Sequence, residues 1–315
     1  MLNHQSYQLC GQASDMATRL RVVTHRVDGA LLIDAGIEAT GSLEAGLAMA
    51  RVCLGGAAEV SLQAEDADRL ASDWGVLVRT DRPIEACLGG QYAGWPVSVD
   101  KFFAMGSGPM RMARGREEML GQLGLTESPQ YAAGVLETTE LPTAEVIRTI
   151  AEQTQVASES LAIMVAPAGS LAGTIQVVAR SVETALHKLH ALKFDVRCVF
   201  SAAGIAPLAP PTRPSDVIGG IGRTNDAILY GGRVTLWVDC EQDAVDAVAE
   251  SVPSVASRDY GRPFAEIFKD YDYDFYKVDP HLFSPAVVQI INRRSGLARR
   301  VGQLQTDVLR ASFGI

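Results

Sequence analysis

Short apolar segments alternate with longer segments of helical periodicity along nearly the whole chain, and this alternation limits the fold more than any other feature. The predicted strands are residues 21–27, 30–34, 60–62, 76–80, 97–103, 133–137, 234–238, 286–292 and 297–302. The predicted helices are the segment up to about residue 20 and residues 42–54, 109–123, 142–153, 171–192, 216–230 and 242–251. Such mixing is typical of sheets covered by helices, so we expect a mixed α/β (α/β or α+β) architecture.

Local signals fix several turns and helix ends. Asp28-Gly29 lies between two strand-like runs and predicts a β-hairpin with a type I′ turn. Ser42 is a good N-cap, and Gly55-Gly56 suits the left-handed end of the same helix. The tetrapeptide Cys53-Leu54-Gly55-Gly56 recurs as Cys87-Leu88-Gly89-Gly90, which fits either two similar helix ends or two glycine pairs on one pocket wall.

Composition excludes several classes of protein. The formal net charge of −9 argues against nucleic acid as a partner, which would need a concentrated basic face. No run approaches the roughly 20 apolar residues of a membrane span, and the first 20 residues lack the apolar core of a secretion signal. The five cysteines are scattered without metal-ligand spacing. We therefore expect a cytoplasmic protein with reduced thiols and no membrane or nucleic-acid partner.

A glycine-rich turn, residues 105–109, follows a predicted strand and opens a predicted helix. Free backbone N–H groups at a helix start can hold an anion, and Arg111, Arg114 and Arg116 would reinforce such a site. The turn matches neither nucleotide-binding glycine motif. A plain tight turn and an anion site both remain open.

Two further polar motifs have structural alternatives. Thr224-Asn225-Asp226 precedes a glycine pair and fits the capped start of a helix. Residues 169–173, Gly-Ser-Leu-Ala-Gly, resemble the G-x-S-x-G pattern of hydrolases only in their outer glycines, because the serine is second and not third. No histidine and acid partners are evident, and Ser170 suits a helix N-cap. His187 and His190 lack an acidic third ligand at metal-binding spacing, so no metal site is predicted.

Arg180 and Glu183 stand three residues apart in a largely apolar helical segment. Residues at this spacing share a helix face. An exposed ion pair and two groups directed into a cleft are both compatible with the pattern, because charges on a mostly buried helix need a partner or an opening.

A series of ordered sequence motifs comprises residues 41–46, 86–89, 93–95, 101–109, 166–176, 180–184, 202–207, 224–226, 229–233, 259–264, 273–277 and 312–314. Together these motifs resemble the methenyltetrahydromethanopterin cyclohydrolase family. The matches run in order over nearly the whole length, which chance does not produce.

The resemblance implies two α/β domains with a substrate pocket between them, assembled as a homotrimer without bound metal or nucleotide. A boundary near Pro142 would give domains 1–141 and 142–315. The implied reaction interconverts the methenyl and formyl forms of a pterin one-carbon carrier, tetrahydromethanopterin or a dephosphorylated form. The family's R-x-x-E catalytic pair corresponds to Arg180 and Glu183.

The remaining residues implied by the resemblance bind the substrate. They are Lys101, Ser107, Gly108, Glu137, Ser170, Thr224, Asn225 and Asp226. Thr138-Thr139 departs from the Ser-Asp expected after the glutamate, which leaves recognition of the carrier's tail open. A carrier-binding or channelling protein without turnover, and a phosphoryl-transfer enzyme using the glycine turn, are the competing hypotheses.

The chemistry suits the catalytic pair. A methenyl bridge between two nitrogens is a cationic amidinium whose carbon is open to water. Glu183 can take a proton from that water and offset the positive charge. Arg180 can hold Glu183 in place or donate to the oxygen of the adduct, and the sequence leaves both roles open.

Overall fold

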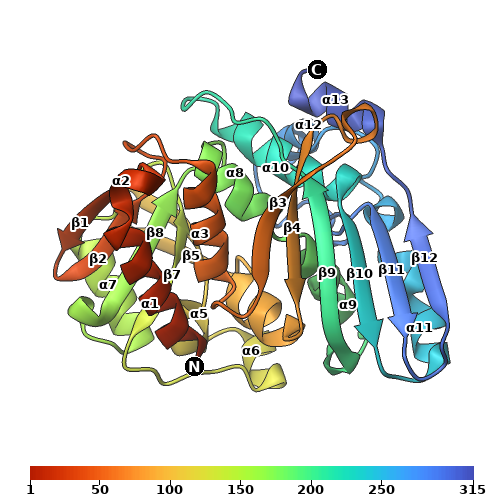
Figure 1. Cartoon of the computed structure of the whole chain (residues 1–315), viewed down its shortest axis with the longest axis horizontal. Coiled ribbons are helices and arrows are strands. Elements are labelled where there is room, and N and C mark those ends of the chain that lie inside the picture. The colour runs from red at the N-terminus through yellow and green to blue at the C-terminus, as the bar shows by residue number, and fades with distance from the viewer. The chain divides into compact units, whose positions relative to one another are not determined.

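The computed structural model describes residues 1–315, and the chain forms two compact units. The first unit comprises residues 1–58 and 85–176, and the second comprises residues 59–84 and 177–315. Each unit contains one six-stranded mixed sheet (Figure 1), so the mixed α/β prediction is confirmed. The predicted boundary between residues 141 and 142 falls inside the first unit, because strands on both sides of it pair in one sheet.

The first sheet has the strand order β1-β2-β8-β7-β6-β5. Its strands are β1 (Val23–Val27), β2 (Ala30–Asp34), β5 (Trp95–Val99), β6 (Phe102–Ser107), β7 (Ala132–Glu137) and β8 (Leu161–Ala166). The central strands β2, β8 and β7 are parallel, and their carboxyl ends therefore meet at one edge of the sheet. Loops that follow parallel strands at such an edge commonly form ligand sites.

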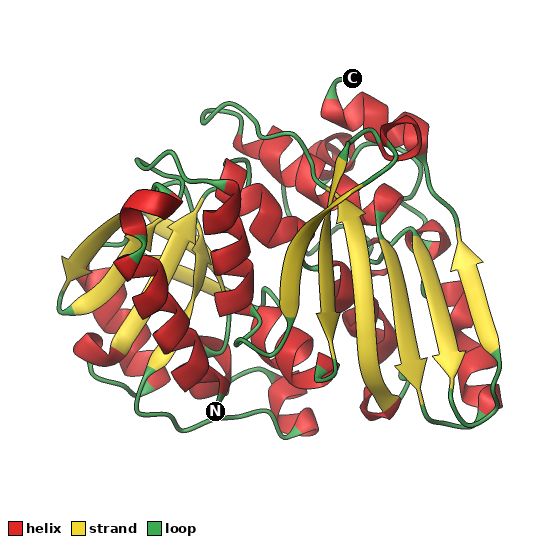
Figure 2. Cartoon of the chain, viewed as in Figure 1, coloured by secondary structure: helices red, strands yellow, loops and turns green.

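Helices lie on both faces of this sheet (Figure 2). They are α1 (Leu2–Asp15), α2 (Ala17–Leu20), α3 (Leu43–Cys53), α5 (Met110–Arg114), α6 (Glu118–Leu123), α7 (Ala144–Thr154) and a π-helix, Ile84–Gln91. Helices α1 and α3 pack over β7, burying Ala133 and Val135, while α7 covers the opposite face near Leu136. Apolar side chains thus fill both sides of the central strands.

The second sheet has the order β12-β11-β10-β9-β4-β3, in which only β10 and β11 run parallel. Its strands are β3 (Glu59–Ala64), β4 (Trp74–Thr80), β9 (Val199–Pro207), β10 (Arg233–Val238), β11 (Val287–Asn292) and β12 (Ala298–Gly302). Along β9 and β10 buried residues alternate with partly exposed ones. This alternation is typical of a mainly antiparallel sheet with one covered face.

Helices of the second unit pack on this sheet and on one another. They are α4 (Ala67–Leu70), α9 (Ser181–Ala191), α10 (Val217–Gly231), α11 (Gln242–Val248), α12 (Phe264–Asp270) and α13 (Thr306–Phe313). Helix α9 packs on β9 and β10, and α10 packs on β9 and against α12 and α13. Helix α8 (Leu171–Val178) precedes α9 directly in the chain. None of the helices has the length and apolar character needed to cross a membrane.

Three of the local signals in the sequence are confirmed. Asp28 and Gly29 both have positive φ, 51° and 85°, in the turn between β1 and β2, as a type I′ turn requires. The Ser42 hydroxyl accepts from the Ala45 amide at 3.0 Å at the start of α3. Gly55 and Gly56 adopt left-handed conformations just after the same helix.

Three predicted elements are divided in the structure. The predicted strand 97–103 is a hairpin of β5 and β6 that turns at Asp100, whose φ is 51°. The predicted helix 109–123 ends at Gly115 in a left-handed conformation and restarts as α6. The predicted helix 171–192 is interrupted at Arg180 between α8 and α9. In each case the sequence was interpreted as one continuous element, and the structure has two.

Candidate active site

Arg180 and Glu183 flank the start of α9 and do not lie on one continuous helix. Arg180 is the N-cap residue, and Glu183 is in the first turn. Both are buried, with 6% and 5% of their surface exposed. The alternative of a solvent-exposed ion pair is therefore wrong. A carboxylate in the first turn is favoured by the positive end of the helix dipole, so this position suits an ionised Glu183.

A close helix–strand contact positions the start of α9. A Cβ atom added to Gly204 of β9 would lie 2.7 Å from Ser181 Oγ, 2.9 Å from Val182 Cγ2 and 3.0 Å from Val234 Cγ2. Only glycine allows the helix to approach this near. The residue immediately before Ser181 and the one immediately after Val182 are Arg180 and Glu183, so this contact determines where both side chains begin.

Ser170 caps helix α8, as the structural alternative from the sequence predicted. Its Oγ accepts a hydrogen bond from Gly173 N at 3.0 Å and donates to Pro167 O at 2.9 Å. Ser170 follows β8 by four residues and is partly exposed. It therefore stands at the edge where the parallel strands of the first sheet end.

Glu137 ends β7 at the same edge, where it is paired in register with Ala166 of β8. It is also opposite Met105 of β6, and Val135 is opposite Ser107. Residues two apart on a strand share a face, so Glu137 and Ser107 lie on the same side of the sheet. This is the face covered by α3, because Cys53 Sγ contacts Ser107 Oγ at 3.2 Å.

Lys101 lies in the turn before β6, beyond the end of β7. It lines an open hollow of about 650 Å³ together with Val99, Asp100, Phe102, Glu140, Leu141 and Thr143. At roughly 3.3 Å per strand residue, the seven residue steps from Lys101 to Gly108 span about 23 Å. Lys101, Ser107 and Gly108 are therefore spread along β6, whereas Glu137 ends β7 and Ser170 follows β8.

The glycine turn at residues 106–109 packs tightly on neighbouring backbone. A Cβ on Gly108, whose φ is 96°, would lie 2.7 Å from Gly134 Cα. Gly108 N donates to Gly90 O at 2.8 Å, and Asn3 Nδ2 donates to Pro109 O at 2.8 Å. The turn is thus held from three sides, which fixes the orientation of the adjacent Ser107.

The arginines after this turn do not form an anion site. Arg111 is fully buried and donates to the carbonyls of Leu88, Gly89 and Gly90, at 3.2 to 3.3 Å. Its guanidinium also pairs with Glu117. Arg114 stacks over the Trp95 ring at 4.7 Å from its centroid. Arg111 thus binds the carbonyls at the end of the π-helix, where Gly90 O also accepts from Gly108 N. The second glycine pair lies within that helix and does not end it.

Thr224, Asn225 and Asp226 lie in the middle of α10, so the prediction that they cap a helix start is wrong. The actual cap is Asp216, which accepts from Gly219 N at 2.8 Å. Thr224 Oγ1 and Asn225 Nδ2 donate to backbone carbonyls one turn earlier. The carboxylate of Asp226, fully buried, accepts from Phe264 N at 2.8 Å.

Burial raises the pKa of the Asp226 carboxyl from 3.8 to about 7, and hydrogen bonds from Ser312 and the Phe264 amide offset part of this effect. Protonation near neutral pH would leave Asp226 able to donate as well as accept. In the structure this side chain ties α10 to the start of α12.

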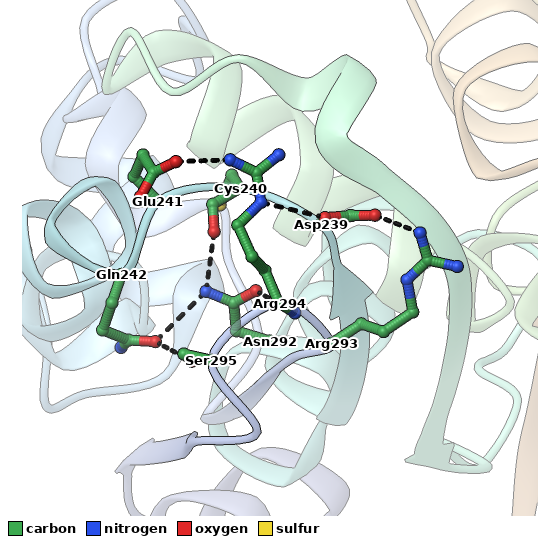
Figure 3. A network of polar contacts seen from close by, with 8 residues as sticks. All are labelled: Asp239, Cys240, Glu241, Gln242, Asn292, Arg293, Arg294 and Ser295. Carbon is green, nitrogen blue, oxygen red and sulfur yellow. Dashed lines mark hydrogen bonds and ion pairs between the residues drawn. The ribbon is translucent and has the colours of Figure 1, made fainter.

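A separate polar cluster lies beyond the ends of the parallel strands β10 and β11 (Figure 3). Asp239 pairs with Arg293 and Arg294, and Glu241 pairs with Arg294. Asn292 Nδ2 donates to Cys240 O at 3.0 Å. The pairing with both arginines lowers the pKa of Asp239. Because the acidic and basic groups satisfy one another, the cluster joins the strand ends and is not a candidate catalytic site.

Two residues beside the candidate site were missed from sequence. Asp34 ends β2 and accepts a hydrogen bond from Gly36 N, and Gly36 packs against Ser170. An aspartate at the end of an apolar strand followed by glycine two residues later was the available signal, since Asp commonly binds the amides of a following turn.

The chain thus has two α/β units, and it carries a buried arginine and glutamate at a helix start. A family model described as "Cyclohydrolase (MCH)" matches residues 1–313, and the chain belongs to this family. A methenyltetrahydromethanopterin cyclohydrolase of Rhodopirellula baltica is 57% identical over 302 residues, covering 95% of this chain and 90% of that protein.

More distant relatives carry the same name. The protein of Methylobacillus flagellatus is 45% identical, covering 99% of this chain and 95% of its own length. That of Methanothermobacter marburgensis is 40% identical, covering 100% and 99%. The similarity thus extends over nearly the full length of each of these proteins.

Proposed function

We propose that this protein is a cyclohydrolase that reversibly hydrolyses the methenyl bridge of a tetrahydromethanopterin-type carrier to the formyl form. The observation that carries the proposal is the buried Arg180 and Glu183 pair at the start of α9, in a chain of the cyclohydrolase family. A buried carboxylate attracts the cationic amidinium of the substrate more strongly than an exposed one does, because water screens the charges at an exposed site.

Glu183 acts as the general base. It takes a proton from water as the oxygen bonds to the methenyl carbon, which neutralises the amidinium and gives a hydroxylated tetrahedral adduct. The carbon–nitrogen bond then breaks, the nitrogen receives a proton, and the hydroxyl loses one to leave the formyl group. One proton is released overall, so the balance favours the formyl form at higher pH.

Arg180 holds the Glu183 carboxylate or donates to the adduct oxygen. Its position as N-cap places its Cα one residue before the helix, three residues from Glu183. A guanidinium has five donors in a fixed fork, so it can serve both groups. Arg180→Lys separates the two roles, because lysine retains the charge but not the two-pronged geometry.

The decisive assay follows loss of the methenyl carrier's near-ultraviolet absorbance with purified protein. Glu183→Gln is expected to lower kcat by about 10²–10⁴-fold, the usual contribution of a general base. Glu250→Gln, a change at an exposed position of the same unit, is the matched control and should retain full activity. Full activity of Glu183→Gln would remove Glu183 from the mechanism. Binding in calorimetry with no rate above the spontaneous one would identify a carrier-binding or channelling protein.

We further propose that Lys101, Ser107, Gly108, Glu137 and Ser170 bind the carrier. Their extended arrangement along β6 and the strand ends suits a long molecule with a ring and a tail. The ammonium group of Lys101 can pair with an anionic part of the tail, whereas Glu137 suits the amino and N–H groups of the pterin ring. Thr224, Asn225 and Asp226 are proposed binding residues of the second unit.

The carrier itself is proposed to be tetrahydromethanopterin or its dephosphorylated form. The relatives named for this carrier support the choice. Parallel assays with methenyl-tetrahydromethanopterin and methenyl-tetrahydrofolate test it, and equal kcat/KM values for the two would contradict it.

We also propose a cytoplasmic homotrimer that works without bound metal or nucleotide, as the family resemblance implies. Light scattering should give three times the 33.6 kDa chain mass. Dialysis against a chelator should leave the rate unchanged. A monomeric mass would contradict the homotrimer. A rate that is lost on dialysis and restored only by metal would contradict a reaction without bound metal.

A further inference from the structure

Asp34 is a buried carboxylate whose hydrogen bonds shape the loop after β2. Its Oδ1 accepts from Gly36 N at 2.9 Å and Ile37 N at 2.7 Å, and its Oδ2 accepts from Glu38 N and Ala39 N, both at 2.8 Å. The residue is fully buried. Four charge-assisted bonds to consecutive amides hold this loop in one conformation, and they leave Asp34 no capacity for direct chemistry.

The loop shaped by Asp34 lies directly against Ser170. A Cβ atom added to Gly36 would lie 2.5 Å from Ser170 Oγ and 2.8 Å from Ser170 Cβ. Gly46 makes the same kind of contact with α8, because a Cβ atom added there would lie 2.7 Å from Ile175 Cβ. The turn that carries Ser170 and the start of α8 therefore pack directly against glycine backbone, which limits how far Ser170 can move toward the loop after β2.

The hydrogen bonds of Ser170 then determine what it can offer a ligand. A serine hydroxyl has one proton and two lone pairs. The proton is donated to Pro167 O, and one lone pair accepts from Gly173 N. The group that remains is a single lone pair on a partly exposed residue, which can receive a hydrogen bond but cannot donate one.

We propose that Asp34 and Gly36 are positioning residues for substrate binding, which hold Ser170 so that its oxygen accepts a hydrogen bond from an N–H group of the carrier's aminopyrimidine ring. This inference rests on the proposed role of Ser170 as a carrier-binding residue. Asp34 holds the loop after β2 by hydrogen bonds, and Gly36 of that loop contacts Ser170. Of these three residues, only Ser170 contacts the carrier.

Gly36→Ala is the direct test. The added methyl group overlaps Ser170, so KM should rise about 10-fold, the effect of losing or misaligning one hydrogen bond of about 1 kcal/mol or slightly more. The kcat value should change by less than about 2-fold, which is within the range of ordinary surface changes. Gly11→Ala is the matched control, because nothing lies within 4 Å of the added atom, and its KM should equal that of the wild type.

Ser170→Gly removes both overlapping atoms and makes room for the methyl group that Gly36→Ala adds. Alone, it should raise KM by about the same factor as Gly36→Ala. Combined with Gly36→Ala, it should raise KM no further, because Gly36 acts only through Ser170. Asp34→Asn should raise KM in the same way, since the amide group turns N–H donors toward backbone N–H groups. If Asp34→Asn does not fold, the glycine variants still decide the question.

The outcomes separate this inference from the proposed function. An unchanged KM in Ser170→Gly would overturn both the binding role of Ser170 and the inference. A further rise in KM when Gly36→Ala is added to Ser170→Gly would overturn the inference alone. If the wild type shows no turnover, the catalytic proposal fails, and the same variants are compared by their calorimetric Kd for the methenyl carrier.

Discussion

Gly204→Ala is expected to impair catalysis by displacing the start of helix α9. The added Cβ would lie 2.9 Å from Val182 Cγ2 and 3.0 Å from Val234 Cγ2, whereas carbon atoms in contact prefer about 3.5–4.0 Å. Ser181 can rotate its hydroxyl away, but valine side chains are stiff at χ1, and both valines are buried. The helix start must therefore retreat by roughly 0.5–1 Å to restore normal contacts.

The displacement has two measurable effects. Overpacking of a well-filled core costs about 1–3 kcal/mol, so the free energy of unfolding should fall by that amount. A displacement near 1 Å at reacting groups can lower the rate about 10²-fold. We expect kcat to fall by about 10- to 100-fold because Arg180 and Glu183 move with α9, while KM changes less.

The assay combines steady-state kinetics with urea unfolding of the same preparations. Gly11→Ala is the control, since it adds the same methyl group within helix α1 where nothing lies within 4 Å. Adding Val182→Ala to Gly204→Ala removes one overlapping methyl group and should restore part of kcat. A Gly204→Ala variant that is destabilised but has wild-type kcat would refute the placement of the catalytic groups at the start of α9.

Three further changes test the buried charges. Arg111→Met should lower the free energy of unfolding by about 3–5 kcal/mol in urea titrations, because it removes the guanidinium that binds Glu117 and the carbonyls of Leu88 and Gly89. A loss below about 1 kcal/mol would contradict this. The folded-state pKa of Asp226 is raised to about 7, so ionisation costs stability as pH rises from about 4 to 7. The free energy of unfolding of Asp226→Asn should therefore rise relative to that of the wild type between pH 5 and pH 8. A difference between the two proteins that is the same at both pH values would refute the effect. Burial lowers the pKa of Lys188 to about 8, so the wild type should gain stability relative to Lys188→Met as pH rises from about 8 to 10. A loss of relative stability over this pH range would contradict the lowered pKa.

Local chemistry explains which parts of the fold were predictable. The Asp28-Gly29 turn and the Ser42 cap depend on residues a few positions apart, and both were confirmed. Strands β8 and β9 were missed, because a short apolar segment without alternation can be a buried strand or part of a buried helix. The hairpin at Asp100 was missed because a non-glycine residue occupies its left-handed position.

The candidate site shows the same division. The spacing of Arg180 and Glu183 predicted neighbouring side chains, but left their exposure undecided. Only packing against β9 showed that both are buried at a helix start. Arg111 was considered for an anion site from its place after a glycine turn, and the structure instead directs it to three backbone carbonyls.

The sequence by itself determined the mixed α/β class, the Asp28-Gly29 turn, the Ser42 cap and the family resemblance, and it predicted the R-x-x-E pair. The tertiary structure alone decided that residues 59–84 belong with the second unit, that β2, β8 and β7 end at one edge, and that Asp34 and Gly36 support Ser170. The reason is the range of the interactions. Turns and caps are set by hydrogen bonds and dihedral preferences within a few residues, whereas strand pairing and close backbone approach depend on residues that are distant in the chain.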